Sequence, residues 1–297
     1  MSRDLHGILP AVLTPFTADG KSVDIEAFRR LVEWLIQKGV HGLFVCGTNG
    51  EGPMLTPAER RQVAEAAVAQ AAGRVPVLVQ TGSLTTEETV ELTQHAREAG
   101  ADGVAVITPW YFAWDDAALF QHFSAAAAAV PGFPVYLYNI PGNTRNEVKP
   151  ALAARLAAAH ANIAGVKDSS KDLNRTEEFI AALSPQHRVF VGTDSLVVPA
   201  LSIGAAGGVA GVANVFPEIM VAMYEAYRAG DLAEARRLQF LTTKVRDAIK
   251  GPAGVMLYKR ILEVRGLTMG GPRRPARPAA AEEEAGAVAA LRALGVL

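Results

Sequence analysis

The stretch Asn162-Ile163-Ala164-Gly165-Val166-Lys167-Asp168-Ser169-Ser170 places a lysine directly after a short run of small and apolar residues. An apolar run of this length that gives way at once to polar residues is typical of a buried strand in a parallel sheet. Lys167 would then lie at the carboxyl end of that strand. Taken alone, the pattern is explained more simply by a strand-end lysine that reaches solvent. The surrounding chain decides between that interpretation and a chemical task for the amine.

Seven more apolar runs of this kind lie along the chain, and a segment with helical signals follows each one. The expected strands cover residues 8–13, 42–46, 76–80, 103–107, 134–138, 163–167, 189–191 and 208–212. Three expected helices begin at residues that can cap them, namely Asp24, Thr56 before Pro57, and Thr85 or Thr86. Later helices are expected at about 115–129, 147–159, 173–183 and 195–203.

Eight strand-then-helix units within roughly 230 residues predict an α/β protein, a (β/α)8 TIM barrel with a C-terminal helical extension. The alternative, a doubly wound open sheet, usually carries a glycine fingerprint after its first strand, and Leu13-Thr14-Pro15-Phe16 has none. We expect residues 1–228 to form the barrel and residues 229–297 to form a helical region packed on it.

The composition excludes several classes of protein. The 297 residues are 50% hydrophobic and carry a net charge of -1, which gives no bulk attraction to nucleic acid or to an anionic membrane. No apolar run approaches ~18 residues, and the first residues lack the apolar core of a signal peptide. The single cysteine, Cys46, excludes an intrachain disulfide and fits a reducing compartment. We therefore expect a cytoplasmic protein with no nucleic-acid or membrane partner.

Active sites of such barrels form at the carboxyl ends of the strands. The chain places several chemically useful residues at these ends, and their joint position is a stronger signal than any one of them. They are Thr48 and Asn49 after the second strand, Tyr138 at the end of the fifth, Lys167 at the end of the sixth, Gly192 and Asp194 after the seventh, and Val209 in the eighth. Alone, Asp194 would be interpreted as a helix cap and Tyr138 as a core aromatic residue.

Together these residues suit Schiff-base chemistry on a 2-oxo acid. A desolvated lysine loses its charge more easily, and the neutral amine can attack a carbonyl. Tyr138 offers a hydroxyl for proton relay, and Thr48 offers a second one. The glycine-flanked turn at Thr48 and Asn49 can direct backbone N–H groups at a carboxylate.

Three motifs resemble the signatures of the dihydrodipicolinate synthase/N-acetylneuraminate lyase family. They are Gly47-Thr48-Asn49-Gly50-Glu51, Tyr138-Asn139-Ile140-Pro141 and Gly165-Val166-Lys167-Asp168, and their order and spacing fit from about Gly7 to the carboxyl terminus. The resemblance implies a class I lyase or synthase that acts on pyruvate without metal or other cofactor, as a homotetramer (a dimer of dimers).

The resemblance also implies individual functions. Lys167 would form the Schiff base, Tyr138 would relay protons, and Thr48 would couple to Tyr138. Thr48 and Asn49 would hold the carboxylate of pyruvate. Tyr111 would match the tyrosine that one subunit donates into the site of its partner.

The sequence departs from the family pattern near the aldehyde substrate. Synthases of the family usually have an arginine two residues after the proline of the tyrosine motif, where this chain has Asn143. Arg145 lies two residues further on and is the alternative candidate to bind that substrate. Asn49 replaces a second threonine, and Trp110 is bulkier than the usual tyrosine. We therefore favour an aldolase for a 2-keto-3-deoxy sugar acid or a similar hydroxylated 2-oxo acid, with 4-hydroxy-tetrahydrodipicolinate synthase, which condenses pyruvate with aspartate semialdehyde, as the alternative.

Two other classes of function remain open. A non-catalytic barrel that binds 2-oxo acids would keep the turn at Thr48 and Asn49 but would not need both Lys167 and Tyr138. A metal-dependent barrel enzyme would need grouped ligands, yet no two of the six histidines have His-x-His or His-x-x-x-His spacing. Both classes are therefore less favoured than Schiff-base chemistry.

Overall fold

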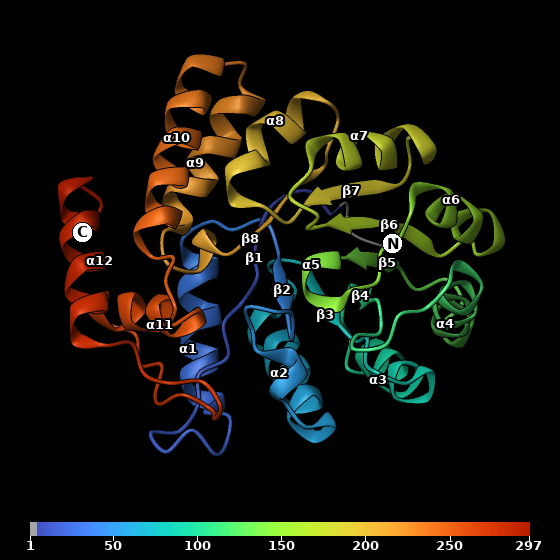
Figure 1. The fold of residues 1–297 in the computed structure, drawn as a ribbon, viewed down its shortest axis with the longest axis horizontal. Helices are drawn as coiled ribbons and strands as arrows, with labels where there is room; N and C mark the ends of the chain where they lie inside the picture. The colour runs from blue at the N-terminus through green and yellow to red at the C-terminus, as the bar shows by residue number, and fades with distance from the viewer. Residues whose placement is uncertain (1–4) are drawn as a thin grey trace.

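Eight short parallel strands form a nearly closed barrel that is surrounded by helices (Figure 1). The strands are β1 (Gly7–Pro10), β2 (Leu43–Val45), β3 (Val77–Gln80), β4 (Gly103–Ile107), β5 (Val135–Asn139), β6 (Ile163–Asp168), β7 (Arg188–Val191) and β8 (Gly207–Ala210). They are hydrogen-bonded in the order β1-β8-β7-β6-β5-β4-β3-β2. An isolated bridge between Ala11 and Phe44 joins the two ends of this order. The computed structural model describes residues 5–297, and in this part the predicted (β/α)8 TIM barrel is confirmed.

Helices follow the strands as the sequence predicted. They are α1 (Ile25–Gln37), α2 (Pro57–Ala71), α3 (Thr86–Glu98), α4 (Asp116–Ala129), α5 (Pro141–Thr144), α6 (Pro150–Ala159), α7 (Leu173–Ala182), α8 (Val197–Ser202), α9 (Pro217–Arg228), α10 (Leu232–Ala248), α11 (Val255–Val264) and α12 (Ala281–Ala293). Asp24 caps α1, Thr85 caps α3, and Thr56 forms a capping box with Glu59 at the start of α2. These caps were predicted because a side-chain oxygen satisfies backbone N–H groups that have no partner inside the helix.

The helix expected over residues 147–159 begins later, at Pro150, and the short α5 was not predicted. The residue before a proline disfavours helical backbone, so Lys149 is extended and Pro150 is the first helical residue. The preceding segment is held by Asn146, whose Nδ2 donates to the carbonyl oxygens of Pro109 and Phe112 at 2.8 and 2.7 Å. A side chain that binds another loop in this way makes the segment a connector instead of a helix.

The strands contribute apolar residues to two layers, one on the outer face of the sheet and one on its inner face. The outer layer lies between strands and helices and contains strand residues such as Val45 and Val166 beside helix residues such as Phe28. The inner layer fills the barrel and contains Phe44, Leu78, Tyr136, Tyr138 and Phe190. A side chain on the inner face near a carboxyl end therefore lies in an apolar interior that opens toward the loops.

An irregularity in β6 decides the face to which Lys167 points. Val135 pairs with Ile163, but the next residue, Tyr136, pairs with Gly165, so one residue of β6 is left over. Side chains alternate along a strand, and Ile163 packs in the outer layer. Without the extra residue Lys167, four positions later, would face outward too. The bulge instead places Lys167 opposite Tyr138, inside the barrel.

The C-terminal helices pack on the barrel at the side of α9 and α1 (Figure 1). Helix α10 contacts α9, α8 and the 3-10 turn Asp194–Leu196, so it reaches the loop that follows β7. The domain division after residue 228 stays a prediction. Among the described residues, no helix combines the length and the apolar character needed to cross a bilayer.

Gly165 is the residue that makes the bulge possible, and replacing it should destabilise the protein. A Cβ at this position would lie 1.8 Å from the carbonyl oxygen of Arg188 on β7. We expect Gly165→Ala to lower the free energy of unfolding in urea by about 1–3 kcal/mol, because the backbone of two paired strands must separate. The control is Gly286→Ala in α12, where no atom lies within 4 Å of the added methyl group. Equal stability of the two variants would contradict this account of the bulge.

Candidate active site

A cavity of about 300 Å³ lies at the carboxyl ends of the barrel strands. It is lined by Ala11, Thr48, Asn49, Tyr138, Ile140, Asn143, Lys167, Ser169, Lys171, Gly192, Asp194, Val209, Gly211, Arg246, Lys250 and Tyr258. The strands and the loops that follow them supply most of this wall. The C-terminal helices supply the remainder, with Arg246 on α10, Lys250 just after α10, and Tyr258 on α11.

Lys167 is buried inside the barrel, with 4% of its surface exposed. Its Nζ lies 4.0 Å from the ring centre of Phe44 and 3.6 Å from that of Tyr138. Burial lowers the pKa of Lys167 from its usual 10.5, because the charged form loses water, while the interaction with Tyr138 acts in the opposite direction. The amine is therefore more easily neutral, and hence nucleophilic, than that of an exposed lysine.

Tyr138 lies beside this amine and is connected to the loop after β2. The two residues are paired across β5 and β6, which brings the phenol to the same level of the barrel as the lysine. The Oη atom of Tyr138 is 3.0 Å from Oγ1 of Thr48, and either hydroxyl can donate. The ring of Phe44 meets the ring of Tyr138 edge-on, with centroids 5.7 Å apart. A proton can therefore pass between the amine, the phenol and the threonine hydroxyl over short distances.

The turn that carries Thr48 and Asn49 is held by backbone bonds. Glu51 N–H donates to Thr48 O at 3.1 Å, and Gly52 N–H donates to Gly47 O at 3.0 Å. Thr14 Oγ1 donates to Gly50 O at 2.6 Å, which fixes the turn against the segment after β1. The two residues predicted to hold a carboxylate are thus presented to the cavity by a fixed turn.

Three polar side chains converge on Gly211. A Cβ at this glycine would lie 2.8 Å from Asn49 Nδ2, 3.5 Å from Tyr258 Oη and 3.6 Å from Asp194 Oδ2. Oδ1 of Asp194 accepts the N–H of Val212 at 3.0 Å, so this carboxyl group joins the segment after β7 to the segment after β8. Burial raises the pKa of Asp194, and burial with the nearby Asp194 raises the pKa of Tyr258.

The structure brings most of the predicted residues together. Thr48, Asn49, Asn143, Gly192 and Val209 all line the cavity beside Lys167 and Tyr138.

Two candidates lie outside this cavity of their own chain. Arg145 ends α5 with an exposed side chain and lines no part of it, which argues against Arg145 as a substrate ligand. Tyr111 is 74% exposed and also lies outside the cavity. Within the described residues, no group of three or more His, Cys, Asp or Glu side chains is close enough together to hold a metal ion.

Some residues of the cavity wall lie outside the strand ends and were not predicted from the sequence. Arg246 lies on α10, Lys250 just after it and Tyr258 on α11, far along the chain, and no strand-end pattern marks them. The only local signal is that Arg246 and Lys250 lie four residues apart, a spacing that brings side chains close together in a helix. Lys171 follows β6 closely and could have been found by extending the strand-end search by three residues.

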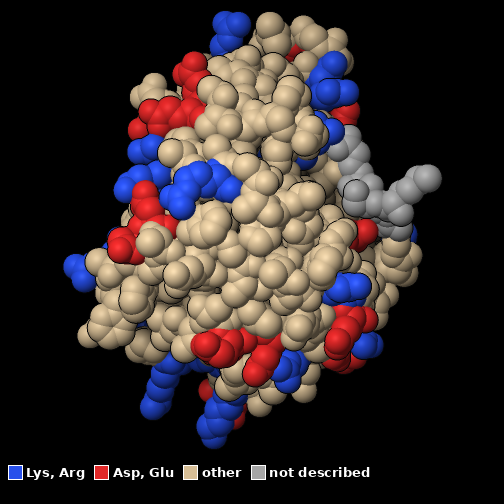
Figure 2. All heavy atoms as spheres, turned by 90° about the vertical axis from the view of Figure 1, so that its right-hand side faces the viewer, with Lys and Arg blue, Asp and Glu red and all other residues tan. Residues whose placement is uncertain are grey.

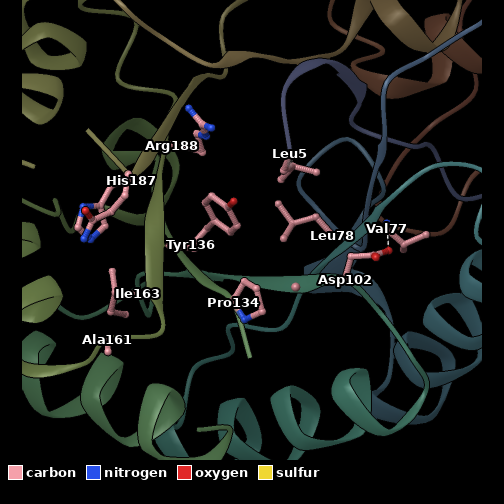
Figure 3. Close-up of a pocket in the computed structure, with 13 residues that line it drawn as sticks. Leu5, Val77, Leu78, Asp102, Pro134, Tyr136, Ala161, Ile163, His187 and Arg188 are labelled. Carbon is pink, nitrogen blue, oxygen red and sulfur yellow. Dashed lines mark hydrogen bonds between the residues drawn. The ribbon is translucent and has the colours of Figure 1, made fainter. Parts of the chain in front are cut away.

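A second hollow of about 310 Å³ lies at the opposite end of the barrel (Figure 3). Tyr136 and Leu78 point into it from the strands, and Asp102, His187 and Arg188 lie around it (Figure 3). Tyr136 and Tyr138 share the inner face of β5 and are separated by one residue. That spacing places Tyr138 with Lys167 and leaves Tyr136 at the amino ends, away from the amine.

A buried ion pair connects the turn after β2 to the C-terminal helices. Glu51 Oε2 lies 2.5 Å from Nζ of Lys259 on α11, and the two side chains are 4% and 0% exposed. The ring of Phe16 lies 4.3 Å from the same Nζ. Glu51 is two residues from Asn49, so the pair holds α11 against the turn that faces the cavity.

The chain is similar to proteins of one family over nearly its whole length. The family model described as the Dihydrodipicolinate synthetase family matches residues 4–294. An uncharacterized DapA-like lyase of Halobacterium salinarum is 43% identical over 296 residues, which cover 99% of this chain and 95% of that protein. A 4-hydroxy-tetrahydrodipicolinate synthase of Methanoculleus marisnigri is 41% identical over 272 residues, covering 91% of this chain and 92% of that protein.

Solved structures superpose over nearly the whole chain. YagE, a prophage protein of the dihydrodipicolinic acid synthase family from E. coli K12 in complex with pyruvate, matches with a TM-score of 0.94 and 33% identity, covering 99% of this chain and 100% of that one. Dihydrodipicolinate synthase from Acinetobacter baumannii, also complexed with pyruvate, matches with a TM-score of 0.92 and 32% identity, covering 98% and 99%.

Replacing Lys259 should be much more costly than breaking an exposed ion pair. We expect Lys259→Met to lower the free energy of unfolding by about 3–5 kcal/mol, because Glu51 is left buried without a countercharge. Glu51→Gln combined with Lys259→Met should recover part of that loss. The control is Lys149→Met, which removes a pair with Asp116 whose side chains are 57% and 40% exposed and which should cost no more than ~1 kcal/mol. Unfolding in urea measures the free energy of unfolding of the two single variants and the double variant. Similar decreases for Lys149→Met and Lys259→Met would contradict the importance of the buried pair.

Proposed function

The chain belongs to the dihydrodipicolinate synthetase family, and on that basis we propose that it is a lyase that forms a Schiff base between Lys167 and pyruvate. The observation that carries the proposal is the buried amine of Lys167, 3.6 Å from the ring centre of Tyr138, on the wall of an open cavity. The two relatives solved with pyruvate support a 2-oxo acid as the first substrate.

The proposed reaction begins with attack of the neutral Lys167 amine on the C2 carbonyl carbon of pyruvate. Tyr138 delivers a proton to the hydroxyl group of the carbinolamine, water leaves, and the C2–N double bond of the imine forms. Loss of a C3 proton then gives the enamine, and the imine nitrogen accepts the electron pair. Relays of this kind typically contribute ~10²–10⁴-fold to a rate. Because the lysine itself is the electron sink, the proposed steps need no cofactor.

The enamine completes the reaction in one of two directions. In condensation, C3 attacks an aldehyde carbon and forms a C3–C4 bond, and water then hydrolyses the imine. In cleavage, the same C3–C4 bond breaks, an aldehyde leaves, and the enamine of pyruvate remains on Lys167. In either direction Thr48 and Asn49, which line the cavity, would hold the carboxylate of pyruvate.

For the second substrate we favour a 2-keto-3-deoxy sugar acid or a similar hydroxylated 2-oxo acid. Asn143 and Ser169 line the cavity and offer neutral hydrogen-bonding groups that suit hydroxyls. The alternative is condensation of pyruvate with aspartate semialdehyde, and several relatives named 4-hydroxy-tetrahydrodipicolinate synthase support it. A binding barrel without catalysis is less favoured, since binding alone explains neither the buried lysine nor its tyrosine.

We also propose that Tyr111 completes the site of a second subunit in a homotetramer. Tyr111, Phe112 and Trp114 are 74%, 61% and 45% exposed, which is unusual for aromatic side chains of this size. The face on which α4 and α6 lie, at the right of Figure 1, carries few charges over its centre (Figure 2). Exposed aromatic clusters on a face with few charges are typical of surfaces that contact another subunit.

Reduction with borohydride in the presence of pyruvate should attach the three-carbon acid covalently to Lys167. Because burial lowers the pKa of Lys167, trapping should persist well below pH 10.5 and should decline as the pH falls through that lowered pKa. Intact and peptide mass spectrometry measure the adduct. Lys167→Met should abolish it, whereas Lys244→Met, an exposed lysine on α10 outside the cavity, should leave it unchanged. An adduct that survives in Lys167→Met would contradict the proposal.

Tyr138→Phe should separate binding of pyruvate from turnover. The variant keeps the ring against Lys167 and Phe44 but removes the hydroxyl that contacts Thr48. We expect kcat to fall by ~10²–10⁴-fold, because the proton relay is lost, while a substantial part of the pyruvate adduct still forms. Steady-state kinetics and adduct yield measure the two effects, and equal loss of both would refute the relay.

A further inference from the structure

The outer wall of the cavity carries cationic side chains that the proposed Schiff-base steps do not use. Lys171 follows β6 in the left-handed region, with a φ of 67°, and is exposed. Lys250 is exposed at the end of α10, and Arg246 lies one turn before it. All three line the same cavity as Lys167. They come from two segments that are far apart in the sequence, the loop after β6 and the C-terminal part of α10 with the residues after it.

The two lysines are free to bind a ligand. Neither Lys171 nor Lys250 makes a hydrogen bond or an ion pair with any residue in the described range 5–297. Arg246 is partly engaged, since Nη1 donates to Ser195 Oγ at 2.6 Å and Nη2 donates to Asp247 Oδ1 at 2.7 Å. Unpaired lysines are ordinary on an open surface, but here two of them lie on the wall of one concave site.

Little negative charge opposes these cations within the cavity. Asp194 is the only acidic residue among those that line it, its Oδ1 already accepts the N–H of Val212, and burial raises its pKa. Asp247 neutralises part of Arg246 but does not line the cavity. Cations on the wall of a low-dielectric cleft attract anions more strongly than they would on a flat surface.

The carboxylate of pyruvate does not need these cations. Its proposed position is at Thr48 and Asn49, beside the imine, where the donors are neutral. On the β5 side, the residues that line the cavity are Tyr138, Ile140 and Asn143, and none of them is a cation, because Arg145 lies outside it. Lys171, Arg246 and Lys250 are therefore left without a ligand in the proposed steps.

We propose that Lys171 and Lys250, with Arg246 behind them, bind a second anionic group at the far end of the substrate, a carboxylate or a phosphate. This inference rests on the proposed function and narrows it. The preferred acceptor aldehyde, or the sugar acid that is cleaved, would then carry an anion at the end remote from the 2-oxo acid. A substrate that ends in hydroxyl groups alone would be turned over less efficiently.

Condensation of pyruvate with matched aldehydes tests this anion site. Glyceraldehyde is compared with glyceraldehyde 3-phosphate, and butanal with succinic semialdehyde, so each pair differs in one terminal anion. We expect kcat/KM to be higher for the charged member of at least one pair by about 10-fold, and which pair responds identifies phosphate or carboxylate. The preference should shrink as ionic strength rises, because salt screens exposed charges.

The variants separate the anion site from the chemistry. Lys171→Met combined with Lys250→Met should raise KM for the charged aldehyde and lower its kcat/KM by about 10-fold, so that the preference is lost. For the neutral aldehyde, kcat/KM should change by less than about 2-fold. Lys244→Met, which removes an equally exposed lysine outside the cavity, is the matched control and should preserve the preference. Equal rates for charged and neutral aldehydes, or equal effects of the two sets of variants, would overturn the inference.

A binding measurement distinguishes failure of this inference from failure of the proposed function. Lys167→Met can form no imine, yet it should bind glutarate more tightly than pentanoate, by calorimetry, and lose that difference when Lys171 and Lys250 are also replaced. If pyruvate is trapped at Lys167 but neither glutarate nor the charged aldehydes are preferred, the anion site is refuted and the Schiff-base proposal stands. If pyruvate is not trapped at Lys167 but glutarate is still bound more tightly than pentanoate, the Schiff-base proposal is refuted and the anion site stands.

Discussion

The burial of one ammonium group constrains the rest of the site. Lys167 is 4% exposed among the rings of Phe44 and Tyr138, and a charged amine in such surroundings loses most of its hydration. Burial therefore lowers the pKa of the amine, so that the charged form is less favoured. The aromatic rings that face the amine stabilise the remaining charge, because their π electrons attract a cation. The same arrangement that makes the charge costly makes the neutral amine available for attack on a carbonyl.

The orientation of that amine depends on backbone irregularity more than on side-chain chemistry. One unpaired residue near Ala164 changes the alternation of β6, and Gly165 allows β6 and β7 to approach where a Cβ would collide with Arg188. Tyr138 is then directly opposite Lys167, and Thr48 is within hydrogen-bond distance of the phenol. A regular strand would place the same lysine between the sheet and the helices, away from the cavity that Tyr138 and Thr48 line.

The C-terminal helices also contribute to the site. The pair of Glu51 and Lys259 ties α11 to the turn after β2, and α10 with the residues after it adds Arg246 and Lys250 to the wall. The barrel strands and their loops thus supply Lys167, Tyr138, Thr48 and Asn49, and the helical region supplies further residues of the cavity wall. In such an arrangement a change in α10 can alter substrate preference while the groups around Lys167 stay in place.

The sequence by itself determined the barrel, its capped helices and the residues at the strand ends, because burial patterns and caps are local and parallel strands bring their carboxyl ends to one rim. Lys167, Tyr138, Thr48 and Asn49 were found in this way. Only the tertiary structure decided that Arg145 lies outside the cavity, that Lys250 and Tyr258 line it, and that Lys259 is buried against Glu51. These facts depend on how distant helices pack, and no spacing along the chain encodes a contact between residues so far apart.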